Sequence, residues 1–98
     1  MIKKVSKRNS DNVKVTFVLP DDHPHGDVSV VGDFNDWTPG EHRFVRRSNH
    51  TYSVGVMLKE DQRYAFRYYS EENGWVNEED ADDYEMNEFG ETNCIVET

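Results

Sequence analysis

Apolar and polar residues alternate with a period of two along most of this chain. The alternation is clearest from Val13 to Leu19, from Tyr52 to Leu58 and from Tyr64 to Tyr68, and shorter stretches cover residues 28–32, 44–47, 75–76 and 93–97. This pattern is typical of half-buried β-strands, and no stretch has the apolar spacing of an amphipathic helix. The sequence therefore predicts six to eight strands, separated by turns at intervals of about ten residues, in an all-β, antiparallel β-sandwich.

The chain has the length of one domain. A chain of 98 residues buries roughly 65% of its unfolded surface, which is enough for a single modest core. No internal repeat or low-complexity linker divides it. We therefore assign residues 12–98 to a single β-sandwich domain and residues 1–11 to a loosely ordered N-terminal segment.

The charge of the chain limits its partners. It carries 20 acidic and 11 basic residues, a net charge of −9, which repels phosphate backbones and anionic lipid surfaces. We therefore expect neither nucleic acid nor membrane partners. No apolar segment has the length of a signal-peptide core or of a transmembrane helix, and the single cysteine, Cys94, allows no internal disulfide. These features favour a cytoplasmic protein.

Half of the acidic residues lie in one segment. Residues 71–91 hold ten of the twenty acids and no lysine or arginine. Such a segment is typical of a solvated, weakly regular connection, and Tyr84, Met86 and Phe89 could pin it back onto the sandwich. A calcium site is the alternative, because the segment is rich in carboxylates. It lacks, however, the glycine and the terminal glutamate at EF-hand spacing.

The sequence contains no combination of residues that indicates catalysis. His23, His25, His42 and His50 fall in predicted loops, without a third metal ligand at a suitable spacing. There is no Gly-rich phosphate loop and no G-x-S-x-G turn. Cys94 lies in the last predicted strand, where we expect a buried, inert thiol. We therefore expect no enzyme, no metal and no cofactor.

Two tryptophans follow turns and are candidates for a binding surface. The β-branched pair Val30 and Val31 leads into a turn rich in Gly, Asn and Asp that ends on Trp37, and Trp75 follows an Asn-Gly turn. The faces of pyranose rings carry C–H bonds that pack on indole, so two such tryptophans suit a sugar chain. The alternative interpretation is that both indoles cap the core of a small sandwich.

Three pieces of the sequence resemble a known family. They are Gly32–Trp37, the stretch Tyr64–Tyr68 followed by Gly74 and Trp75, and Phe89–Ile95. In their order and spacing they resemble the family 48 carbohydrate-binding modules, the isoamylase N-terminal domains, which include the glycogen-binding domain of the AMP-activated protein kinase beta subunit. The resemblance implies an immunoglobulin-like (early-set) sandwich. It also implies that Trp37 and Trp75 stack on glucose rings and that Asn93 hydrogen-bonds sugar hydroxyls.

The chain departs from this family at several positions of the implied site. A lysine that assists sugar binding in some members aligns with Ala65. Arg67 is a candidate substitute, because we assign only Arg67, and not Arg63, to the strand face of Ala65. For Arg67, however, we favour pairing with nearby acids over a sugar contact. Phe89 aligns with the apolar residue that presses on the sugar chain, and Glu91 replaces a threonine. The implied carbohydrate site is therefore similar to that of the family without being the same.

Two functions remain open from the sequence. The first is non-catalytic binding of an α-1,4-linked glucan (glycogen, starch or a maltooligosaccharide) through Trp37, Trp75, Asn93, Phe89 and Arg67, on behalf of a glucan-metabolising enzyme. The second is a protein-interaction or scaffold domain that has kept the sandwich, has lost the sugar and uses its acidic face to meet a partner. Trp75 favours the first, whereas Ala65, Glu91 and the net charge favour the second.

Overall fold

The chain folds as an antiparallel β-sandwich, which confirms the fold class predicted from the sequence. The computed structural model describes residues 1–6 and 10–98. Over these residues the strands are β1 (Ile2–Ser6), β2 (Asn12–Pro20), β3 (Val28–Gly32), β4 (Val45–Arg46), β5 (Thr51–Lys59), β6 (Arg63–Ser70), β7 (Gly74–Val76), β8 (Asp83–Met86) and β9 (Thr92–Glu97). The same residues contain one short 3-10 turn, η1 (Asp33–Asn35), and no helix that is long and apolar enough to cross a membrane.

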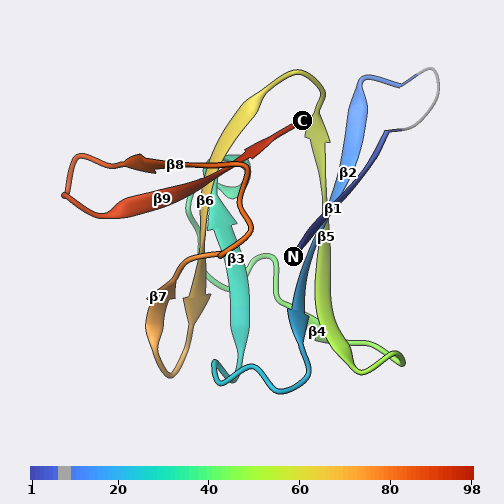
Figure 1. Ribbon diagram of the computed structural model, residues 1–98, viewed down its shortest axis with the longest axis vertical. Coiled ribbons are helices and arrows are strands. Elements are labelled where there is room, and N and C mark those ends of the chain that lie inside the picture. The colour runs from blue at the N-terminus through green and yellow to red at the C-terminus, as the bar shows by residue number, and fades with distance from the viewer. Residues whose placement is uncertain (7–9) are drawn as a thin grey trace.

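The strands form two sheets (Figure 1). The first sheet has the order β1-β2-β5-β4, and the second has the order β3-β6-β9-β8 with β7 paired to β6. The segment between η1 and β4 passes from one sheet to the other. It pairs with the outer edge of β3 through a bridge between Ser29 and Arg43 before it continues into β4. The edge of β3 is therefore covered, whereas β8, and the short β7 beside β6, lie at open edges of the second sheet.

The alternation of apolar residues places the core between the sheets. On β2 and β5 the apolar positions pair directly, with Val15 opposite Val56 and Phe17 opposite Val54. The Phe17 ring packs against Phe66, with ring centroids 4.9 Å apart, and against the edge of Tyr68. Among the described residues, neither tryptophan belongs to this buried aromatic cluster. The interpretation in which the indoles cap the core is therefore not the arrangement found.

The structure differs from the sequence predictions at the N-terminus. Residues 1–11 were expected to be loosely ordered, but Ile2–Ser6 form β1, which pairs along its whole length with β2. Residues 7–9 of that segment lie outside the described residues. β1 exposes most of its side chains and therefore leaves little hydrophobic pattern in the sequence.

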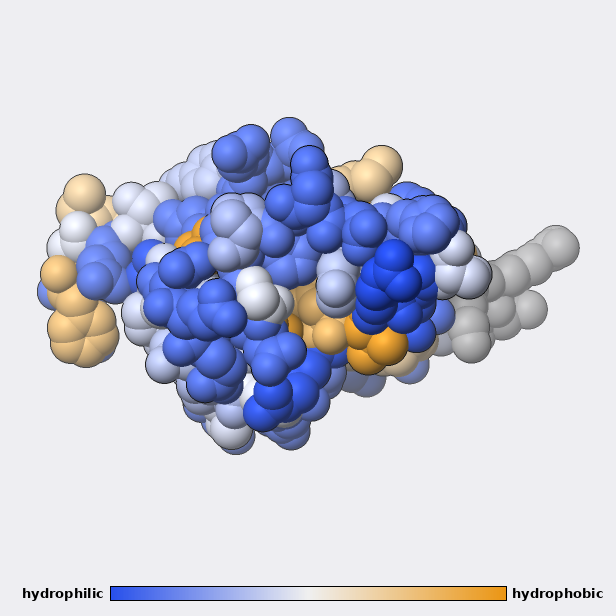
Figure 2. Space-filling view, turned by 90° about the horizontal axis from the view of Figure 1, so that it is seen from below, coloured by the Kyte–Doolittle hydropathy of each residue, from blue (hydrophilic) through white to orange (hydrophobic). Residues whose placement is uncertain are grey.

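The acidic segment is more regular than expected. It contains β7 and β8 in place of a weakly regular connection. β8 and β9 form a hairpin that projects beyond the other strands, at the left of Figure 1. Figure 2 shows apolar atoms at this projecting end of an otherwise largely hydrophilic surface. Met86 and Phe89 are the most exposed apolar residues of the hairpin, at 74% and 80% exposure. The prediction that these two side chains pin the segment onto the sandwich is therefore wrong.

Candidate functional site

The turn after β3 is shaped by a close backbone approach. Gly32 ends β3 opposite Phe66, and a Cβ atom at this position would lie 2.4 Å from the carbonyl oxygen of Ala65. The buried side chain of Asn35 then folds the chain back. Its Oδ1 accepts a hydrogen bond from the Gly32 amide at 3.0 Å, and its Nδ2 donates to the Val30 carbonyl at 2.9 Å. The turn is thus fixed by the need for a residue without a Cβ atom at position 32 and by the two hydrogen bonds of the buried Asn35 side chain.

Trp37 is held at both its backbone and its ring. Asp36 and Trp37 adopt left-handed backbone conformations, with φ of 53° and 56°, and the Trp37 amide donates to the Gly32 carbonyl at 3.0 Å. The indole Nε1 donates to Asp33 Oδ1 at 3.1 Å, while Asp33 Oδ2 accepts from the Ala65 amide at 2.8 Å. One carboxylate therefore ties the half-buried indole to β6.

The tip of the β8–β9 hairpin is organised by Asn87. Its Oδ1 accepts hydrogen bonds from the amides of Phe89 and Glu91, at 2.9 Å and 3.0 Å. Its Nδ2 donates to Asn93 Oδ1 at 3.2 Å. The side chain of Phe89 extends from this turn into solvent. Asn87 thereby sets the positions of both Phe89 and Asn93.

A groove of about 360 Å³ lies between the Trp37 turn and the hairpin. It is lined by Asp33, Trp37, Ala65, Asn87, Glu88, Phe89 and Asn93. The structure therefore brings together three of the residues predicted from the sequence, namely Trp37, Phe89 and Asn93. Asp33 and Asn87 are site residues that were not predicted from the sequence. The available signal was that each lies in a short turn, where Asp and Asn side chains commonly bind backbone amides.

Trp75 belongs to a separate group of side chains. It lies on β7 opposite Tyr69, is 41% exposed, and packs edge-on against the Tyr69 ring with centroids 5.1 Å apart. The guanidinium carbon of Arg67 lies 5.5 Å from the centroid of the indole, within cation–π range. Trp75 and Arg67 do not line the groove at Trp37.

Arg67 connects the Trp75 group to the hairpin. Its Nε donates to Asn77 Oδ1 at 2.8 Å, and its Nη1 donates to Glu91 Oε2 at 2.6 Å. The Arg67 side chain is only 13% exposed, so its donors are largely committed to these partners. The contact with Glu91 is the pairing with a nearby acid that the sequence favours for Arg67.

Arg63 lies on the same face of β6 as Arg67, which corrects the assignment made from the sequence. Both arginines are two residues from Ala65, and alternation gives all three the same face. Arg63 donates to Asp83 at 3.0 Å, to Glu85 at 2.9 Å and to Glu97 at 2.5 Å. The arginine lowers the pKa of the Asp83 carboxyl, and the three carboxylates raise the pKa of the guanidinium. Arg63 is thus occupied in holding β8 to its neighbours.

Other acids of residues 71–91 also have structural partners. Lys4 of β1 contacts Asp82 at 2.5 Å, and the hydroxyl of Tyr84 lies 2.7 Å from the carbonyl oxygens of Glu78 and Glu79. These partners lie within residues 71–91 themselves, so the Tyr84 hydroxyl ties the segment together and does not pin it onto the sandwich as predicted. Within residues 1–6 and 10–98, no group of three or more His, Cys, Asp or Glu residues is placed to hold a metal ion. Cys94 is buried, and burial raises the pKa of its thiol.

Comparison with known proteins identifies one family. The model described as carbohydrate-binding module 48 (isoamylase N-terminal domain) matches residues 26–85, from the loop before β3 into β8. The match includes the Trp37 turn, β6 and Trp75, and it ends before Phe89 and Asn93. No curated protein matches the chain.

Proposed function

This chain belongs to the family of carbohydrate-binding modules 48, the isoamylase N-terminal domains, and from that premise we propose that it binds an α-1,4-linked glucan without acting on it chemically. Glycogen, starch and maltooligosaccharides are the ligands of this class. In this proposal the module holds the glucan for an enzyme that acts on it. The family is one of carbohydrate-binding, non-catalytic modules, so carbohydrate binding in general follows from membership.

The groove between the Trp37 turn and the β8–β9 hairpin is the observation that carries the proposal. It offers an indole on one side, a phenyl ring on the other, and the amides of Asn87 and Asn93 among its lining. Stacking on Trp37 and Phe89 would hold the faces of a glucose ring, and the amides would bond its hydroxyls. Such a combination of aromatic faces and amides fits a neutral sugar.

Trp75 would add a second contact on the same sheet. Alternation along β6 gives Ala65, Arg67 and Tyr69 one outer face, and Trp75 pairs with Tyr69 on that face. A glucan that leaves the groove along β6 would meet Trp75 next. In this arrangement Arg67 supports the indole through its cation–π contact and has few donors left for sugar hydroxyls.

The expected affinity is weak. If each indole buries about 100 Å² of sugar face, the gain is roughly 2 to 3 kcal/mol for each ring. Association costs offset much of this gain, which leaves dissociation constants between about millimolar and tens of micromolar. Weak sites of this kind act on polymers, where many ligand units raise the effective concentration.

The exposed hairpin tip supports a second candidate function. Met86 and Phe89 expose 74% and 80% of their surface beside a strand that carries Asp83 and Glu85. An apolar tip with an acidic flank suits a protein partner that has a basic rim. This is the protein-interaction function that the sequence left open.

A titration with sugars tests the first function against the second. Intrinsic tryptophan fluorescence is followed with maltoheptaose, β-cyclodextrin and glycogen, for the parent chain and for Trp37→Ala and Trp75→Ala. We expect saturable changes, a loss of roughly tenfold in affinity for Trp37→Ala, and a smaller loss for Trp75→Ala. Met57→Ala is the matched control, because Met57 is 48% exposed on β5 of the other sheet. The absence of any response up to tens of millimolar sugar would reject glucan binding and favour the protein-interaction function.

A further inference from the structure

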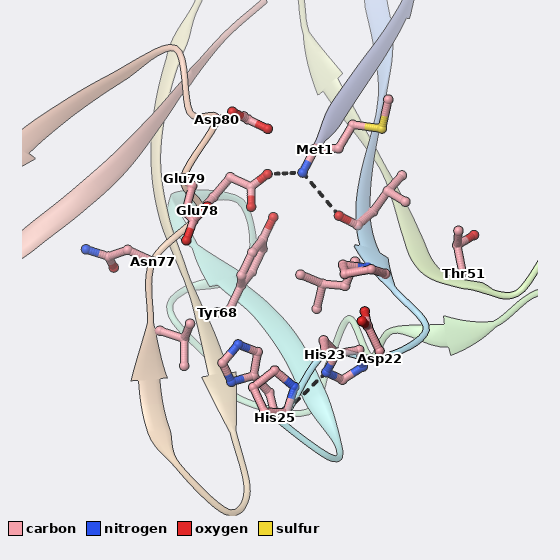
Figure 3. Close-up of a pocket in the computed structure, with 15 residues that line it drawn as sticks. Met1, Asp22, His23, His25, Thr51, Tyr68, Asn77, Glu78, Glu79 and Asp80 are labelled. Atoms are coloured by element: carbon pink, nitrogen blue, oxygen red, sulfur yellow. Dashed lines mark hydrogen bonds and ion pairs between the residues drawn. The ribbon is translucent and has the colours of Figure 1, made fainter.

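The two faces of β2 meet different surroundings. Its inner side chains pack in the core, and near the end of the strand Leu19 and Tyr68 of β6 line a cavity of about 530 Å³ between the sheets (Figure 3). The side chains that alternate with these, Lys14 among them, point away from the core. Because the described residues form only two sheets, the outer face of the first sheet has no covering layer.

That outer face is basic, although the chain as a whole is acidic. Residues that pair directly across antiparallel strands lie on the same face. The register therefore puts Lys14 with Val5 of β1 and Met57 of β5, and alternation adds Lys3 and Lys59. None of the strand residues that pairing and alternation give to this face is acidic. Its charge is thus opposite in sign to the net charge of −9.

The lysines of this face are available to a partner. Lys3, Lys14 and Lys59 are exposed and take part in no ion pair within the part of the chain that the structure describes. The acids that follow in the chain, Asp11 and Glu60, lie just outside the ends of β2 and β5. An anionic group that approaches the middle of the face therefore meets only cations.

Apolar side chains flank the central lysine. Val5 and Met57 are 60% and 48% exposed and lie on either side of Lys14, in one row across β1, β2 and β5 that spans about 10 Å. The Lys14 side chain lies over Gly55, since a Cβ atom there would come 3.0 Å from the lysine Cε. The row therefore presents an apolar group, a cation and a second apolar group.

The tip of the β8–β9 hairpin presents the complementary arrangement. Met86 and Phe89 are its most exposed apolar residues, and Glu88 lies between them in the sequence. Glu88 is exposed and forms no ion pair within residues 1–6 and 10–98. The hairpin projects beyond the other strands, so its tip can reach the surface of another molecule (Figure 1).

We propose that the hairpin tip of one copy of this chain docks on the outer face of the first sheet of another copy. Glu88 meets the ammonium group of Lys14. Met86 and Phe89 cover the exposed apolar side chains on either side of that lysine. Because the two surfaces are different parts of one chain, the contact is heterologous and continues from copy to copy in an open row.

The match between the two surfaces favours a second copy over other anionic occupants. A lipid surface or a nucleic acid extends well beyond this face and would meet the acids around it, whereas the tip is narrow enough to contact one lysine and its apolar neighbours. The contact is small, and the net charge of −9 on each copy opposes it. We therefore expect a dissociation constant of about 0.1 to 1 mM.

Sedimentation equilibrium of the 98-residue chain tests the contact, at protein concentrations from about 0.02 to 2 mM. We expect the average mass to rise with concentration and to pass the mass of a dimer, because a heterologous contact does not close at two copies. A chain that stays monomeric, or that stops at the dimer, would overturn the proposal. The experiment contains no sugar, so its outcome is independent of the proposed glucan binding.

Two variants each remove one of the two surfaces. Lys14→Glu reverses the central charge of the face and keeps the tip, whereas Phe89→Ser removes the ring of the tip and keeps the face. Each variant alone should associate at least tenfold more weakly than the parent. An equimolar mixture should form a complex of one copy of each variant and nothing larger, because each copy retains only one intact surface. Variants that stay monomeric when mixed would reject the contact.

Arg43→Glu is the matched control for the change in charge. Arg43 is exposed and pairs with the edge of β3 in the second sheet. This variant should associate as the parent does, within about twofold. An equal loss in Arg43→Glu and Lys14→Glu would show that net charge governs association and would overturn the proposal. Amide shifts around Lys14 with anionic lipid vesicles or polyglutamate, in a parent chain that stays monomeric, would assign the face to another occupant.

Discussion

The two sides of the groove are built in different ways. The Trp37 side is fixed by the backbone, through the close approach of Gly32 to β6, the buried Asn35 and two residues in left-handed conformations. The Phe89 side is an exposed hairpin tip whose shape depends on one side chain, Asn87, and on the contact between Arg67 and Glu91. The Trp37 side is therefore continuous with the packed strands of the sandwich, whereas the Phe89 side can change with little effect on the fold.

Because the two sides are built differently, substitutions on them should affect the stability of the fold and the binding of a ligand to different extents. Changes on the Trp37 side should alter folding and binding together, because the turn is continuous with β3 and β6. Changes on the hairpin side should alter binding more than folding, because the tip buries little apolar surface. Three substitutions test this contrast, in order of decreasing expected effect.

Gly32→Ala should give the largest effect. A Cβ atom at this position would lie 2.4 Å from the carbonyl oxygen of Ala65, and backbone atoms cannot move aside without disturbing the β3–β6 pairing. We expect the free energy of unfolding in urea to fall by about 3 kcal/mol. Gly55→Ala is the control, because its Cβ would meet the flexible end of Lys14 at 3.0 Å and Thr16 Oγ1 only at an ordinary contact distance of 3.9 Å. Equal stability of the two variants would contradict the rigid description of the Trp37 side.

Asn87→Ala should separate binding from stability. The substitution removes the acceptor for the Phe89 and Glu91 amides and the donor to Asn93. We expect the affinity for maltoheptaose to fall severalfold, while the free energy of unfolding falls by only about 1 kcal/mol. Asn49→Ala is the matched control, since Asn49 accepts a hydrogen bond from Thr51 in a turn of the other sheet. Unchanged sugar affinity in Asn87→Ala would remove the hairpin from the proposed site.

Arg63→Gln should have the smallest effect, and that effect should depend on pH. The pKa of Asp83 is lowered mainly by its hydrogen bond to Arg63, from an ordinary value of 3.8. Stability from this pairing is therefore present above the unfolded pKa and is lost as the pH falls through the folded one. Melting temperatures should differ slightly between Arg63→Gln and the parent at pH 7, and the difference should shrink below about pH 4.

A matched arginine controls for the loss of a surface charge. The Arg47 side chain donates only to the hydroxyl and carbonyl of Ser53 in the described part of the chain, so Arg47→Gln removes a cation without a carboxylate partner. Its effect on the melting temperature should not change over the same pH range. A difference for Arg63→Gln that stays constant down to pH 2 would show that the Asp83 pairing does not stabilise β8.

The strands with the clearest pattern in the sequence are those that bury alternate side chains. β2, β5 and β6 each place every second residue in the core, and this burial is what produces a period of two. β1 and β8 are paired through their backbones but expose nearly all of their side chains. Because their side chains are not buried in alternation, β1 and β8 carry no period of two that would predict them.

The candidate site could be predicted only in part for a similar reason. The types and positions of Trp37, Trp75 and Asn93 are visible in the sequence, but the division into a groove and a separate Trp75 group follows from tertiary contacts. Arg67 is an example, because its partners Asn77 and Glu91 lie 10 and 24 residues away. Whether an arginine is free to bind a ligand depends on such distant partners, which alternation alone does not specify.

The open edge at β8 bears on how copies of this chain behave when they lie close together. β8 ends that sheet with unpaired backbone groups, and an edge of this kind can extend into the sheet of another copy. Here the edge is only four residues long and carries Asp83 and Glu85, on a chain of net charge −9. Two copies that approach by this edge repel each other. On the glucan polymer of the proposed function, many copies would therefore lie side by side without merging into a continuous sheet.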